Sequence, residues 1–279
     1  MNYRHSFHAG NFADLVKHAL VLWLVRAGSA HGPIAILDTH AGGGLYDLSG
    51  DATRSREAEA GVLRLMTSDD LPASLKALAD AVRAVNPELA PGDPIRWYPG
   101  SPVLVARELR DDDRYLGFEL NEVVLPLLAE SLAAFPEADF QAGDGYDAVV
   151  EAAAQAEGPL VLIDPPFERP DDYVRAAETA VALVRQDPGA TVAIWTPLKD
   201  LETFDGFLRR LAGPGSSSIG PVLVAEARLR PLTDPMKMNG CAMVVVNPPE
   251  GTEAVAAEIC AWVARALGGE GAKGEVWRL

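Results

Sequence analysis

The sequence contains few cysteines and no long hydrophobic run, and both features exclude certain classes of protein. Its 279 residues include two cysteines, Cys241 and Cys260, which offer neither a disulfide framework nor a C-x-x-C zinc motif. No stretch of about 18 apolar residues occurs without charges, and the opening MNYRHSFHAG lacks the apolar segment of a secretion signal. Because 48% of the residues are nevertheless apolar, we expect a globular, soluble, cytoplasmic protein with reduced cysteines and no membrane segment.

Positive charge is also scarce. The chain has 24 lysines and arginines against 40 acids, a formal net charge of −16, which argues against a phosphate-rich partner. The charge is unevenly distributed, however, because Arg4, Lys17 and Arg26 lie in residues 1–31 with Asp14 as the only acid there. Residues 228–237 are locally positive as well. Either these segments contact a nucleic acid, or they are short basic stretches without functional meaning.

Apolar runs that alternate with helical periodicity predict the fold class. Strands are expected at 34–39, 114–120, 138–142, 159–164, 191–196, 222–230 and 241–247, and helices near 102–110, 122–134, 145–156, 171–186, 200–212 and 252–268. Alternating strands and helices indicate a doubly wound α/β fold with a parallel sheet. The last two strands have no helix between them, so an antiparallel hairpin should close the edge, as in the seven-stranded methyltransferase sheet.

One interval is too long for a simple strand-helix-strand unit. About 75 residues separate Asp38 from Arg114, and they carry two helical patterns, at 53–67 and 72–86. We therefore predict a small helical insertion at 46–100 within a domain made of 1–45 and 101–279, with an N-terminal segment and helix at 1–28. The glycine-rich stretch GGEGAKGE at 268–275 looks like a frayed terminal linker.

Ligands of doubly wound sheets bind at the carboxyl ends of the strands. The first strand ends in DTHAGGG, residues 38–44, which is not the G-x-G-x-x-G of a dinucleotide site. The second ends at Glu119, suited to ribose hydroxyls, and the third runs into Asp144 and Gly145, suited to an adenine amino group. Each acid alone could be a helix cap, whereas both together favour an adenosine-containing cofactor such as S-adenosylmethionine.

The fourth strand ends in LIDPPF, residues 162–167. Two prolines remove amide donors and leave carbonyl oxygens beside Asp164, so an amine presented there meets only acceptors. This arrangement suits N-methylation, with Asp164 taking a proton or orienting the amine and Phe167 stacking on a flipped base. The alternative is an aspartate cap followed by a Pro-Pro turn with Phe167 in the core.

Histidines and a serine complete the candidates. His18 lies on a helix expected from Asn11, where an i,i+4 pair with Asp14 on a solvated face is one interpretation. Ser101 begins a helix and could simply cap it. The histidine spacings are irregular and no cysteine joins them, so we expect no metal site.

D-P-P-F resembles the signature of S-adenosylmethionine-dependent amino methyltransferases that act on DNA adenine, RNA adenine or protein glutamine. Further motifs follow the order and spacing of one family, and the chain resembles the bacterial 23S ribosomal RNA adenine-N6 methyltransferases, the RlmJ family, over nearly its whole length. The motifs are YRHSFHAGNFADLVKH (3–18), LDTHAGGG (37–44), YPGSP (98–102), FEL (118–120), GDG (143–145), LIDPPFE (162–168) and VVNPP (245–249).

This resemblance implies a Rossmann-like class I methyltransferase fold and a set of functional positions. Cofactor contacts would fall on His18, His40, Ser101, Glu119, Asp144, Gly145 and Asp164. Asp164 would be catalytic, with Pro165 and Phe167 completing the pocket, and Tyr3 would meet the RNA. Arg4 and Lys17 would add positive charge to this segment. Better-known members carry Tyr where Phe167 stands, which keeps the stacking face.

The leading hypothesis is thus N6-methylation of an adenine in 23S ribosomal RNA, naked or in an assembly particle, by a monomer using S-adenosylmethionine. One alternative keeps this chemistry on DNA adenine or a protein glutamine. Another is an RNA chaperone that binds the cofactor without turnover.

Overall fold

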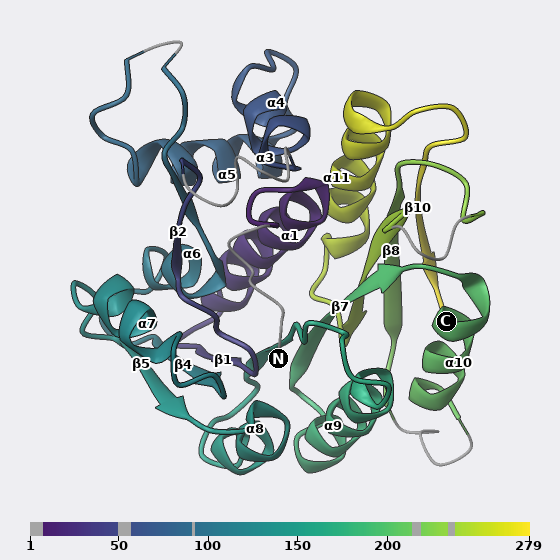
Figure 1. Cartoon of the computed structure of the whole chain (residues 1–279). Coiled ribbons are helices and arrows are strands. Elements are labelled where there is room, and N and C mark those ends of the chain that lie inside the picture. The colour runs from purple at the N-terminus through teal and green to yellow at the C-terminus, as the bar shows by residue number, and fades with distance from the viewer. Residues whose placement is uncertain (1–7, 50–56, 91–92, 214–218, 234–237) are drawn as a thin grey trace.

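The protein is described here from a computed structural model, which covers residues 8–49, 57–90, 93–213, 219–233 and 238–279. Tyr3 and Arg4, expected to contact RNA, lie outside these ranges. An eight-stranded sheet runs through the molecule in the order β10-β8-β9-β7-β6-β1-β4-β5 (Figure 1). The strands are β1 (Ala35–Asp38), β4 (Arg114–Glu119), β5 (Ala138–Ala142), β6 (Leu160–Ile163), β7 (Thr191–Leu198), β8 (Val222–Arg228), β9 (Gly240–Val246) and β10 (Lys273–Arg278).

The strand directions confirm the doubly wound prediction. β5, β4, β1, β6 and β7 are mutually parallel, and β9 is antiparallel to both β7 and β8. The predicted β8–β9 hairpin is present, with β9 inserted between β7 and β8. Because the five parallel strands share one direction, their carboxyl ends meet along one edge of the sheet, which we call the carboxyl edge.

The sheet has eight strands rather than the seven expected, because residues 273–278 form β10 and not a frayed linker. β10 pairs antiparallel with β8 and packs beside α11 (Thr252–Leu267). A Cβ at Gly274 would overlap the backbone of Cys260 in α11. The glycine that suggested a linker is therefore required for a strand to pass this close to a helix.

Helices cover both faces of the sheet (Figure 1). One apolar core lies between the sheet and the helices on the side of α1 and α11. A second core lies between the sheet and the helices on the opposite side. The first face holds α1 (Phe12–Ser29), α6 (Ser101–Ala106), α7 (Leu125–Leu132) and α11, and the second holds α8 (Gly145–Ala153), α9 (Asp172–Gln186) and α10 (Leu201–Leu211). Burial of strands on both faces explains their near-continuous apolar sequences.

The central helix is α1. Asn11 caps it, as predicted, by accepting hydrogen bonds from the amides of Ala13 and Asp14. The helix packs against α5, α6 and α11 as well as the sheet, so its sides are buried and Asp14, Lys17 and His18 are all less than 7% exposed. The expectation of a solvated face for His18 is therefore wrong, because the elements that cover this side come from distant parts of the chain.

In the part that the structure describes, the long interval after β1 holds a two-stranded sheet with three helices between its strands, and then α6. β2 (Leu45–Asp47) pairs antiparallel with β3 (Trp97–Pro99), and between them lie α3 (Glu57–Ala60), α4 (Val62–Met66) and α5 (Ala73–Ala84). The helix expected at 53–67 is, in its described part, two short helices broken at Gly61. A Cβ at Gly61 would overlap the carbonyl oxygen of Gly10, so the break lets the start of the chain pack here. The boundaries 46 and 100 stay a prediction.

Candidate active site

The carboxyl edge brings together acids that lie far apart in the sequence. Asp38 ends β1, Glu119 ends β4, Asp144 follows β5 and Asp164 follows β6. Since β5, β4, β1 and β6 are neighbours in that order, the four carboxylates form a row along one edge. This is where doubly wound sheets bind ligands.

Asp164 is held by a buried lysine. The Lys17 Nζ lies 2.6 Å from Asp164 Oδ2 and 3.0 Å from Asp14 Oδ1, and the Lys17 side chain is 8% exposed. The Nζ also lies 5.9 Å from the ring centroid of Trp195 in β7. Lys17 was expected on a basic surface facing RNA. The structure places its ammonium inside instead, where one cation lies between two carboxylates and orients Asp164.

The turn after β6 is unusual in its backbone. Phe167 has φ of 49°, a left-handed conformation that is strained for a residue with a large side chain. Its ring is 6% exposed and packs with centroid distances of 4.5 Å to Tyr173 and 5.8 Å to Trp195. Pro165 is buried as well. Asp164 does not cap α9, whose N-cap is Asp171, so the cap interpretation of Asp164 is wrong.

Asp38 was not selected from the sequence, yet it is the most buried acid of the row at 1% exposure. Ser101 Oγ donates to it at 2.7 Å, Tyr115 Oη at 3.2 Å and the His40 amide at 3.1 Å. Burial raises the pKa of Asp38 to about 6, against the opposing effect of the Ser101 and His40 hydrogen bonds. Its position at the end of the first strand was the sequence signal that could have identified Asp38 as a site residue. Asp38 thus fixes the Ser101 hydroxyl at the carboxyl edge.

His40 follows in the turn after β1. Burial lowers the pKa of His40 to about 4, so the ring is neutral at pH 7. Its Nδ1 lies 2.7 Å from Thr39 Oγ1, and its ring contacts Tyr146 edge-on at 4.8 Å between centroids. A neutral imidazole offers one donor and one acceptor, which suits a polar ligand better than a charged one.

Glu119 is tied to the glycine turn. Its Oε2 accepts from the Gly42 amide at 3.0 Å and its Oε1 from the Asn121 amide at 2.7 Å. Gly42 has φ of +67°, which glycine adopts without strain. Each carboxylate oxygen keeps a further lone pair, so Glu119 can still accept hydrogen bonds from two ribose hydroxyls.

Asp144 and Gly145 begin α8. Asp144 is the N-cap and accepts from the Tyr146 amide, as the cap alternative predicted. It also forms a two-pronged ion pair with Arg175 of α9, at 2.8 and 3.0 Å. A Cβ at Gly145 would overlap the carbonyl oxygen of Thr39, so only glycine lets α8 begin against the turn after β1.

His18 lies at the base of the insertion. Its Nδ1 is 2.8 Å from Tyr98 Oη in β3, and the two rings are 5.5 Å apart. Tyr98 is fully buried. The contact between His18 and Tyr98 therefore links α1 to β3, the strand that leads into Ser101.

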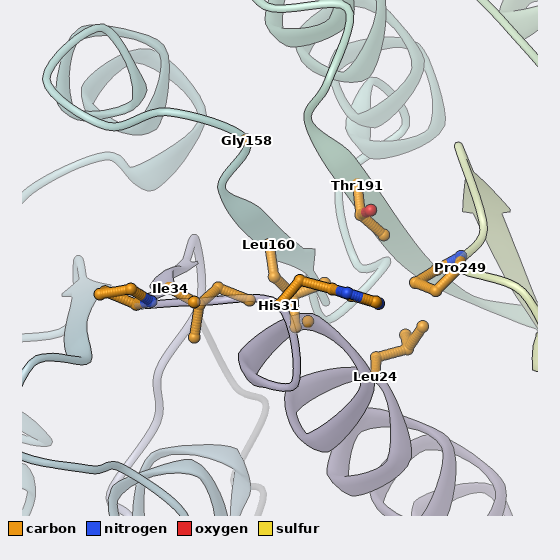
Figure 2. A pocket seen from close by; sticks show the side chains of 10 residues that line it. Leu24, His31, Ile34, Gly158, Leu160, Thr191 and Pro249 are labelled. Atoms are coloured by element: carbon orange, nitrogen blue, oxygen red, sulfur yellow. The ribbon is translucent and has the colours of Figure 1, made fainter.

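Two cavities lie at opposite edges of the sheet. One of about 10 Å³, room for about one water, is lined by Lys17, Asp38, Ser101, Asp164 and Trp195 among others. The larger, about 210 Å³, lies at the amino ends of β1, β6 and β7 and is lined by Leu24, His31, Ile34, Leu160, Thr191 and Pro249 among others (Figure 2). Because Asp164 and Lys17 line the small cavity, a ligand of cofactor size would lie along the carboxyl edge next to this cavity.

In the ranges that the structure describes, no group of three or more histidine, cysteine, aspartate or glutamate side chains is placed to hold a metal ion. None of the helices in those ranges combines the length and apolarity needed to cross a bilayer.

The chain is similar to known proteins over nearly its whole length. Residues 31–279 match the family model described as RsmJ: Ribosomal RNA large subunit methyltransferase D, RlmJ. Ribosomal RNA large subunit methyltransferase J of Haemophilus influenzae is 32% identical, covering 97% of this chain and 95% of that protein. The Escherichia coli protein of the same name is 30% identical, covering 94% and 92%. The crystal structure of LPL1258 from Legionella pneumophila superposes with a TM-score of 0.83 at 22% identity, covering 97% and 98%.

The sheet is doubly wound, and the family match over residues 31–279 makes the chain an α/β methyltransferase. The chain belongs to the RlmJ family of ribosomal RNA large subunit methyltransferases. The family resemblance and the methyltransferase activity expected from the sequence are thereby confirmed.

Proposed function

We propose that the protein methylates N6 of an adenine in 23S ribosomal RNA with S-adenosylmethionine as the methyl donor. The observation that carries the proposal is Asp164 at the end of β6, oriented by the buried Lys17 beside a small cavity that Trp195 also lines, with the Phe167 ring packed on Trp195. The relatives are named for methyl transfer to large-subunit ribosomal RNA. A cytoplasmic site of action follows from that substrate.

The acids along the carboxyl edge fit the ribose and the adenine of this cofactor. When bound, the cofactor supplies an electrophilic methyl group on sulfur. Glu119 would accept from the ribose hydroxyls, because both of its oxygens are oriented by amides and keep free lone pairs. Asp144 and Gly145 would meet the adenine. Ser101 and His40 would line the remaining length, between the glycine turn and the small cavity beside Asp164. The contact expected of His18 stays a prediction, since its ring contacts the buried Tyr98.

Asp164 would act on the substrate amine. Lys17 occupies Oδ2, and Oδ1 accepts no hydrogen bond from the residues that the structure describes. Oδ1 can therefore accept from the exocyclic amine of a flipped adenine. As the nitrogen gains the methyl group it becomes positive and loses a proton, and a carboxylate in contact with that proton stabilises the developing charge.

The aromatic part of the pocket depends on Phe167. Its ring is 6% exposed in this structure, so a base that stacks on it would enter as the turn opens. Pro165 would keep the turn rigid. Binding of RNA by Tyr3, Arg4 and the 228–237 segment stays a prediction. In that segment Arg228 pairs with Glu226 and Arg230 is exposed, while Tyr3, Arg4 and residues 234–237 lie outside the described ranges.

The test is transfer of tritium from labelled S-adenosylmethionine to unmodified 23S ribosomal RNA, followed by nucleoside analysis. N6-methyladenosine is expected from the wild type and not from Asp164→Ala. Asp164→Asn keeps an acceptor but is a weaker base, so its activity should fall without vanishing. Transfer only to duplex DNA or to a protein amide would contradict the substrate. Binding of cofactor and RNA without transfer would leave the chaperone alternative.

A further inference from the structure

α9 connects the two parts of the site. Its Tyr173 packs on Phe167 beside the catalytic turn, and its Arg175 reaches Asp144 at the start of α8. Arg175 lies outside every motif identified in the sequence. Its side chain is 20% exposed, although an unpaired arginine at the surface would extend into solvent.

The guanidinium of Arg175 is fixed on two sides. Nη1 donates to Asp144 Oδ2 at 2.8 Å and Nη2 donates to Asp144 Oδ1 at 3.0 Å, the paired geometry that only arginine offers. Its carbon lies 4.4 Å from the ring centroid of Tyr146, a cation–π contact. The Tyr146 ring in turn meets His40. Arg175 therefore sits at the centre of a cluster that includes two expected cofactor contacts.

This arrangement leaves one defined acceptor on Asp144. Oδ1 accepts from both the Tyr146 amide and Arg175, whereas Oδ2 accepts from Arg175 alone among the described residues. Burial works to raise the pKa of Asp144, and the hydrogen bonds and charge of Arg175 outweigh it, so that the pKa lies below its usual value. The carboxylate is thus ionised at neutral pH and cannot rotate without breaking the pair.

We propose that Arg175 is a positioning residue for the adenine ring of the cofactor, holding Asp144 so that Oδ2 accepts a hydrogen bond from the exocyclic amine. The inference rests on the proposed use of S-adenosylmethionine and deepens it. Arg175 acts through Asp144, which touches the ligand. Its loss should weaken recognition of the amine more than it weakens binding of the rest of the cofactor.

The test compares the binding of two ligands that differ only at the exocyclic amine of the purine ring. S-adenosylhomocysteine carries the amine, and S-inosylhomocysteine carries a carbonyl oxygen in its place, which would face the carboxylate of Asp144. Isothermal calorimetry on the wild type should show tighter binding of the adenosyl ligand by about tenfold or more, because one hydrogen bond is replaced by a repulsive contact. In Arg175→Gln this preference should shrink to about threefold or less, with a loss of about tenfold in affinity for the adenosyl ligand.

Controls separate positioning from a general loss of structure. Arg175→Lys keeps the charge without the paired geometry and should fall between wild type and Arg175→Gln. Arg169→Gln removes an exposed arginine that pairs with Asp171 just before α9, and it should leave both affinities unchanged. In Asp144→Asn the preference should already be low, and adding Arg175→Gln should lower it no further, because the two residues act in series.

Several outcomes would overturn the inference. An unchanged preference in both Arg175 variants would show that Asp144 needs no positioning, and an equal loss for both ligands would make the pair merely structural. A wild type that binds the two ligands equally would show that Asp144 does not read the amine. A wild type that binds neither ligand would instead remove the proposed cofactor, and this result is distinguishable because it appears before any variant is made.

Discussion

The two halves of the carboxyl edge are organised differently. At β1, β4 and β5 each acid accepts a hydrogen bond from at least one backbone amide of a turn, such as the Gly42 and Asn121 amides on Glu119. At β6 the position of Asp164 depends on Lys17, which lies 147 residues earlier in the chain. The first half, which we call the cofactor half, is held partly by backbone amides of the turns, which no side-chain substitution removes. The second, the catalytic half, is assembled by tertiary packing, so side-chain changes should damage it more.

The largest effect is expected in the catalytic half. Lys17→Met removes the ammonium between Asp14 and Asp164 and leaves two carboxylates without it, which should cost about 3–5 kcal/mol of unfolding free energy and reduce methyl transfer strongly. The exposed pair Arg26–Glu108 is the control, because Arg26→Gln should cost only about 0–1 kcal/mol. Urea unfolding and tritium transfer measure both. Similar losses in the two variants would show that Asp164 does not depend on the buried ammonium of Lys17.

Asp38 in the cofactor half should make stability depend on pH. Its native pKa of about 6 lies above the ordinary value of 3.8, so between these values the unfolded carboxyl is ionised while the native one stays protonated. Stability should therefore fall as pH rises through this window, by about 3 kcal/mol from this group.

Asp38→Asn supplies the comparison, since the amide does not titrate. The difference in unfolding free energy between wild type and variant should change between pH 4 and 6, whatever the fixed cost of the substitution. A difference that stays constant from pH 3 to 7 would show that Asp38 keeps an ordinary pKa.

A glycine tests how closely the cofactor half is packed. Gly145→Ala places a methyl group against the Thr39 carbonyl, which should cost about 1–3 kcal/mol and weaken binding of S-adenosylhomocysteine. Gly206→Ala is the matched control, because Gly206 lies within α10 with nothing within 4 Å of the added Cβ. That change should stabilise the protein by about 0.5–1 kcal/mol. Thermal unfolding and calorimetry separate the two, and equal stability changes would place α8 farther from β1.

The smallest effect is expected from Phe167→Tyr, which keeps the ring against Tyr173 and Trp195 and adds one hydroxyl. Methyl transfer should change by less than about threefold, because the stacking ring is retained. Phe167→Ala, which removes the ring, should reduce activity far more. Equal activity in the tyrosine and alanine variants would remove Phe167 from the pocket.

The sequence predicted what depends on local pattern. Every expected strand formed within about two residues of its bounds, and Glu119, Asp144 and Asp164 do lie along one edge, because strand periodicity and parallel winding determine both. It did not predict the position of Lys17, since helical periodicity says nothing of which elements will cover a helix. Arg175 escaped notice for a similar reason, as its partner Asp144 lies 31 residues away. β10 was missed because its glycine, needed for close packing, is also typical of linkers.

The burial of α1 also bears on how the protein is made. This helix is synthesised before the elements that cover it, because it packs against α11, more than 200 residues later in the chain, as well as against α5. Until α11 is synthesised, the apolar residues of α1 lack part of their cover, and such transiently exposed surface favours aggregation and chaperone binding. The Lys17 ammonium cannot pair with both Asp14 and Asp164 until β6 and Asp164 have been synthesised. Asp164 therefore gains its lysine only after β6 is synthesised, and shortening the chain before α11 should leave α1 without part of its cover.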